Sequence, residues 1–73
     1  MEDKIGIDDF ILECWAIDES GWKFVLFSDL WWEIKAESED LGEFRAQSLS
    51  HDDVEVTLAK LLDQVRKVAD AVL

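Results

Sequence analysis

The chain has 73 residues, which is the size of one small domain, and 18 acidic against 7 basic residues give it a net charge of −11. So acidic a surface repels nucleic acid and anionic membranes, which disfavours direct binding to either. With only one cysteine, Cys14, the chain can form no internal disulfide, and this indicates a reducing compartment.

The N-terminal residues 1–8 are polar, and we expect them to be loosely ordered. They lack the basic and apolar regions of a signal peptide, and no apolar run in the chain reaches the ~18 residues of a membrane span. We therefore expect a cytoplasmic protein, located in the host cytoplasm if a phage encodes it.

Residues 9–17 alternate in a way that is typical of a strand. In an extended chain one side would carry Phe10, Leu12, Cys14 and Ala16, and the other Ile11, Glu13, Trp15 and Ile17. The pattern predicts a first strand, followed by a turn over residues 18–21, where Gly21 permits a positive φ.

The stretch from Trp22 to Glu37, WKFVLFSDLWWEIKAE, holds three of the four tryptophans. Its alternation predicts two strands, about 22–27 and 31–37, joined by a turn at Ser28-Asp29-Leu30. One long strand with a bulge at Ser28-Asp29 is the alternative. We favour the turn because Ser-Asp is common turn chemistry.

An acidic loop over residues 37–42 and a short strand over 43–49 complete the predicted sheet. The helix expected over 51–72 rests on apolar residues spaced three and four apart. These are Val54, Leu58, Leu61, Val65, Val68 and Val72, with Leu62 and Ala69 beside them. Ser50 and Asp53 fit a capping box, and Leu49 and Val54 fit a hydrophobic staple.

We predict a single α+β domain over residues 1–73: an antiparallel β-meander of three to four strands within 9–49, with one C-terminal helix packed on one face. A single helix covers only one face of such a sheet. The face predicted to be covered carries Phe10, Leu12, Cys14, Trp22, Phe24, Leu26, Trp32, Ile34 and Phe44. The other carries Ile11, Trp15, Ile17, Val25, Phe27 and Trp31. The two faces could be exchanged, since both are apolar, but either choice leaves large side chains uncovered.

No catalytic motif is present in the sequence. His51 lies among helical neighbours that cannot converge on one metal ion, Cys14 has no neighbouring base, and the three glycines form no phosphate-binding loop. We therefore expect a protein that is not an enzyme, with no cofactor and no metal.

Exposed aromatic and acidic side chains are the remaining signal. Tryptophans are common anchors at interfaces, and carboxylates steer a basic partner. The predicted partner-binding residues are Glu13, Trp15, Phe27, Asp29, Trp31, Glu33, Glu37, Glu39 and Asp40. Acidity that serves only solubility is the alternative.

In size and acidity the whole chain resembles the DNA-mimic inhibitors made by bacteriophages, including anti-CRISPR proteins. The resemblance implies an inhibitor or adaptor that docks on a basic nucleic-acid-handling protein. Carboxylates at i and i+2 of a strand lie about 6.6–7 Å apart, a spacing that could imitate successive phosphates. The chain departs from this type in its aromatic content, which suggests hydrophobic anchoring as well.

Two alternatives stay open. Strands followed by the segment SLSHDDVEVTLAKLLDQV resemble HicB-type antitoxin domains, without their DNA-binding tail, and imply an antitoxin or immunity-type protein that neutralises a basic toxin. A homodimeric structural module, in which the second sheet face pairs with itself, is the other.

Overall fold

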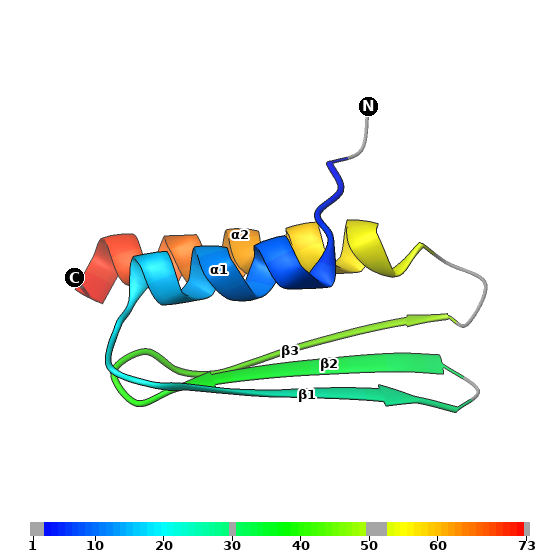
Figure 1. The fold of residues 1–73 in the computed structure, drawn as a ribbon, viewed down its shortest axis with the longest axis horizontal. Helices are drawn as coiled ribbons and strands as arrows, with labels where there is room; N and C mark the ends of the chain where they lie inside the picture. Colours follow the sequence, from blue (N-terminus) through cyan, green and yellow to red (C-terminus); the bar gives the residue numbers. More distant parts are fainter. Residues whose placement is uncertain (1–2, 30, 50–52, 73) are drawn as a thin grey trace.

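The structure, a computed structural model, describes residues 3–29, 31–49 and 53–72. Its elements in chain order are α1 (Ile7–Ile17), β1 (Trp22–Ser28), β2 (Trp31–Ser38), β3 (Gly42–Leu49) and α2 (Val54–Val72). The strands form one antiparallel sheet in the order β1-β2-β3, and both helices lie on the same side of it (Figure 1). The predicted α+β meander with a C-terminal helix packed on one face is therefore confirmed.

The strand predicted over residues 9–17 is wrong, because this segment belongs to α1. Phe10 and Cys14 lie four residues apart and are both fully buried, which is the spacing of one helix face. Leu12, which the alternation placed with them, is 66% exposed. Asp8 and Asp9 lie in the first turn, where their negative charges interact favourably with the helix dipole. The described residues consequently form a sheet of three strands, the lower of the two numbers predicted.

The other three strands lie close to their predicted positions. In the hairpin of β1 and β2, Phe24 pairs with Ala36 and Ser28 with Trp32, which confirms a turn in place of a bulged single strand. The second turn, residues 39–41, is shorter than the predicted acidic loop, because β2 continues to Ser38. Gly42 follows with a φ of 93°, a conformation that glycine adopts most easily.

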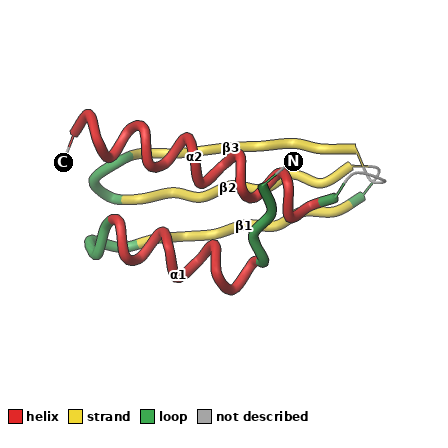
Figure 2. The backbone as a smooth tube through the Cα atoms, turned by 90° about the horizontal axis from the view of Figure 1, so that it is seen from above, coloured by secondary structure: helices red, strands yellow, loops and turns green. Residues whose placement is uncertain are grey.

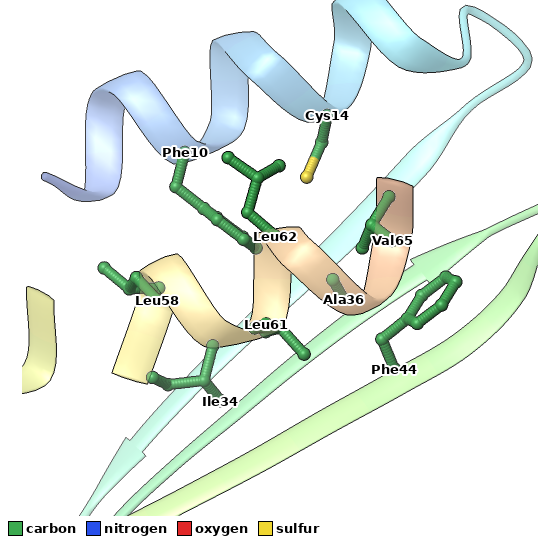
Figure 3. Packing of buried hydrophobic residues seen from close by; sticks show 9 residues of the cluster. All are labelled: Phe10, Cys14, Ile34, Ala36, Phe44, Leu58, Leu61, Leu62 and Val65. Carbon is green, nitrogen blue, oxygen red and sulfur yellow. The ribbon is translucent and has the colours of Figure 1, made fainter. Parts of the chain in front are cut away.

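The helices divide the covered face of the sheet between them. Seen from above, α1 runs along the β1 side, while α2 lies over β2 and β3 (Figure 2). Apolar side chains from both helices and the sheet meet in one core (Figure 3). Its buried members are Phe10, Cys14, Ile34, Ala36, Phe44, Leu58, Leu61, Leu62 and Val65. The strand residues predicted for the covered face do lie on it.

The predicted stripe on the C-terminal helix is confirmed for Leu58, Leu61, Leu62, Val65 and Ala69, which are buried. The start of α2 differs from the prediction. Asp53 acts as its N-cap: its side chain accepts a hydrogen bond from the Glu55 amide at 3.0 Å. The predicted roles of Ser50 and His51 lie outside the described residues.

Candidate protein-binding surface

No helix formed by the described residues lies over the second face of the sheet (Figure 1). Alternate residues of the three strands point to this side, as the register of the two hairpins requires. We call it the open face. Its described side chains are Lys23, Val25, Phe27, Trp31, Glu33, Lys35, Glu37, Glu43, Arg45 and Gln47.

One end of the open face is apolar. Near the turn between β1 and β2, Val25 is 54% exposed, Phe27 48% and Trp31 40%. They come from the two strands of one hairpin, which holds them on the same side of the sheet. Contiguous apolar side chains on a small monomer mark an interaction surface more often than single exposed ones do.

The centre of the open face holds ion pairs. Lys35 Nζ lies 3.0 Å from Glu43 Oε1 and 3.7 Å from Glu37 Oε2, and Arg45 Nε lies 3.0 Å from Glu43 Oε1. The hydrogen bond from Lys35, with a second from Arg45, lowers the pKa of Glu43, and the same bond raises the pKa of Lys35. Three acidic and three basic side chains share this face, so its formal charges balance.

The acidic excess therefore lies elsewhere, and part of it gathers where the loop after α1 meets the turn between β2 and β3 (Figure 1). Glu19, Glu39 and Asp40 are exposed there. The Glu39 amide donates a hydrogen bond to the Gly21 carbonyl at 3.3 Å, which joins the two connections. This acidic end adjoins the charged part of the open face, through Glu37 and Glu43.

Asp18 lies at the same end but is buried and fully engaged. Its carboxylate accepts hydrogen bonds from the Ser38 hydroxyl and from the amide and hydroxyl of Ser20 at 3.0 and 2.8 Å. The Ser38 hydroxyl oxygen in turn accepts from the amides of Asp40 and Leu41, both at 3.2 Å. These bonds, with that of Ser38 the largest cause, lower the pKa of Asp18. The carboxylate thus holds the fold together and is not part of a binding surface.

The predicted partner-binding residues separate into four places. Phe27, Trp31, Glu33 and Glu37 share the open face, Asp29 follows β1 in the turn to β2, and Glu39 and Asp40 occupy the acidic end.

Glu13 and Trp15 lie apart from these, on α1, in the helix layer across the sheet from the open face (Figure 1). Glu13 forms an ion pair with Arg66 of α2, with Glu13 Oε2 3.1 Å from Arg66 Nη2. The predicted set omitted Val25, although its alternation with Phe27 in the sequence placed both on one face.

Side chains that could hold a metal ion are not brought together in the part of the chain described. No three His, Cys, Asp or Glu side chains among these residues are placed so that they could ligate one ion. Burial raises the pKa of the Cys14 thiol to about 12, with a smaller contribution from the charge of Glu13, so the thiol stays protonated at neutral pH. A hollow of about 430 Å³ between the N-terminal segment and the helices is lined by side chains of both charges, among them Lys60 and Asp63.

Comparison of the chain with protein-family models, with curated proteins and with solved structures found no match. Neither described helix is long and apolar enough to cross a membrane. The case for a function therefore rests on the open face and on the distribution of charge.

Proposed function

We propose that this protein is a non-catalytic binding protein that docks on a basic protein through the open face of its sheet. The observation that supports it most is the uncovered sheet face with Val25, Phe27 and Trp31 half-exposed, on a chain of net charge −11.

A domain of this size has a small core and little stability to spare. Each Å² of apolar surface that is buried stabilises a fold by roughly 25 cal/mol. Three large apolar side chains that stay partly in water therefore leave some of this stabilisation unused. Buried against a partner, the same side chains supply the anchors that interfaces use. The open face thus has the composition of an interface: apolar side chains at one end and paired charges beside them.

The charge of the whole chain defines the chemistry of the partner. A net negative surface speeds the approach of a positively charged protein and repels acidic ones. Carboxylates on β2 at Glu33 and Glu37 are separated by Lys35, so the face offers no continuous row of negative charge. This arrangement favours apolar anchoring with electrostatic steering over imitation of a DNA backbone.

Within this class we propose an inhibitor or adaptor of a basic nucleic-acid-handling protein, since such proteins carry extended basic surfaces. Phage inhibitors of this size and acidity, anti-CRISPR proteins among them, are the narrower class to test first. An antitoxin that neutralises a basic toxin would use the same chemistry, and the identity of the bound protein distinguishes the two.

Two tryptophans provide a matched test. Trp31 on the open face and Trp15 on α1, in the helix layer on the other side of the sheet, are each 40% exposed. We expect the full chain and its Trp15→Ser variant to retain the same basic protein from an extract of the source cells. The Trp31→Ser variant should bind that protein at least about tenfold more weakly, as loss of an anchor does.

Equal binding by both variants, or recovery of a partner that is not basic, would overturn the proposal. Folding is checked separately by denaturant unfolding. Each substitution should lower the free energy of unfolding by less than about 3 kcal/mol, the lower end of the range for a fully buried aromatic residue replaced by alanine. A larger loss in Trp31→Ser would make Trp31 a core residue and not an anchor.

A further inference from the structure

β1 is an edge strand whose outer side has no partner strand among the described residues. In an antiparallel ladder, backbone groups point alternately toward the neighbouring strand and away from it. The Glu39 amide donates to the Gly21 carbonyl, so the odd-numbered residues of β1 face β2. The backbone N–H and C=O groups of Phe24 and Leu26 therefore point outward, where another strand could pair with them.

The C-terminal half of β1 also exposes apolar side chains on both faces of the sheet. Val25, Leu26 and Phe27 follow one another and are 54%, 50% and 48% exposed. Earlier in the strand, Phe24 packs edge-on against Phe10 of α1, with ring centroids 5.9 Å apart. Figure 2 shows α1 beside the first part of β1, and further along the strand Leu26 shares a hollow with Ile7 of α1 and Leu58 of α2.

Charge distinguishes β1 from every other element. It contains no acidic residue, whereas α1, β2, β3 and α2 each contain at least one, and its only charge is Lys23. Natural edge strands are commonly protected by proline, a bulge or charged side chains, and Lys23 is the only such charge in β1. The chain contains no proline, and β1 pairs with β2 without interruption from Trp22 to Ser28. The opposite edge, β3, carries Glu43 and Arg45.

We propose that β1 pairs antiparallel with β1 of a second copy of this chain. Two chains of charge −11 repel each other, and a contact through β1, which contains no carboxylate, adds no carboxylate of its own strand to that repulsion. Centred on Val25, the pairing sets Lys23 of one copy opposite Phe27 of the other on the open face, where an ammonium group over a ring is favourable. On the covered face, Phe24 lies opposite Leu26.

This pairing has two-fold symmetry, with the axis perpendicular to the sheet. It joins two sheets of three strands into one and leaves both open faces on the same side. The inference does not depend on the proposed function, because it rests on backbone pairing at the edge of the sheet, although Val25 and Phe27 belong to the open face as well.

Sedimentation equilibrium tests the pairing. We expect the full chain to reach twice its 8.4 kDa mass as concentration rises, and to do so more readily at high salt, where repulsion is screened. Val25→Lys should remain monomeric, because it sets two ammonium groups together at the axis. Gln47→Lys places the same charge on the other edge strand and should dimerise like the parent chain. Circular dichroism establishes that both variants fold.

Cross-linking tests the register. Val25→Cys adds one exposed thiol to a chain whose native Cys14 is buried. Oxidation should link two copies of this variant, whereas Gln47→Cys should stay unlinked. A chain that stays monomeric at every salt concentration, a folded Val25→Lys variant that still dimerises, or equal linking of the two cysteine variants would overturn the proposal.

Discussion

The Ser38 hydroxyl donates a hydrogen bond to the Asp18 carboxylate and so joins the loop after α1 to the end of β2. Trp22 Nε1 adds a bond of 2.8 Å to the Asp18 carbonyl. One short loop thereby connects the helix layer to the sheet at the acidic end of the molecule.

Protonation of Asp18 at acidic pH should weaken this connection. The hydrogen bonds lower the pKa of Asp18 below its usual value of 3.8, so the folded state holds this proton less tightly than the unfolded state. The stabilisation is present above pH 3.8 and is lost as the pH falls through the lower pKa of the folded state. We expect the melting temperature of Asp18→Asn to be lower than that of the parent chain at pH 7.

The difference in melting temperature between the parent chain and Asp18→Asn should become smaller as the pH falls below 3.8. Melting curves followed by circular dichroism across this range measure it. Glu19→Gln removes a neighbouring exposed carboxylate and should melt like the parent chain at pH 7. If Asp18→Asn and Glu19→Gln behave alike, the Asp18 network does not stabilise the fold.

The helical state of residues 7–17 predicts unequal costs for two neighbouring substitutions. Phe10→Ala removes a fully buried aromatic ring and should lower the free energy of unfolding by about 3–5 kcal/mol. Leu12→Ala removes an exposed side chain and should change it by no more than about 0.5 kcal/mol. Denaturant unfolding measures both. A strand at this position would have buried both side chains together, so similar losses would contradict α1.

The sequence predicts the sheet well because alternation and turn residues agree along residues 22–49. It mispredicts α1 because a spacing of four, as between Phe10 and Cys14, fits both a strand face and a helix face. In so short a segment, only packing against Leu62 and the rest of α2 decides between them.

The same ambiguity explains why Glu13 and Trp15 lie apart from the other predicted partner-binding residues. The sequence groups Glu13 and Trp15 with Trp31 only if residues 9–17 form a strand. The balance of charge on the open face depends on register, which places Lys35 of β2 between Glu37 and Glu43. No local pattern in the sequence predicts that pairing across strands.

Because Cys14 is buried, we expect its thiol to react slowly with thiol reagents. A pKa raised from 9.0 to about 12 reduces the thiolate fraction at pH 8 about a thousandfold. We therefore expect Ellman's reagent to modify the native chain far more slowly than the chain unfolded in guanidinium chloride. Equal rates would show that Cys14 is accessible.

The same shift affects stability at high pH. The folded state keeps the Cys14 proton up to about pH 12, while the unfolded state releases it near pH 9.0, so stability should fall between these values. Cys14→Ala should remove that part of the decline, although it leaves a small cavity. If the stability of Cys14→Ala declines as steeply over this pH range, groups other than Cys14 cause the decline.

Salt should act in opposite directions on the two proposed interactions. Steering of a basic partner by a chain of charge −11 is long-range, and the Debye length falls from about 30 Å at 0.01 M salt to about 10 Å at 0.1 M. Association with the partner should slow accordingly, while pairing of two acidic chains through β1 should strengthen. Stopped-flow association rates and sedimentation equilibrium, measured in the same buffers, compare the two. If the partner associates equally fast in both salts, the charge of this chain plays no part in recognising it. The apolar end of the open face, Val25, Phe27 and Trp31, would then account for recognition alone.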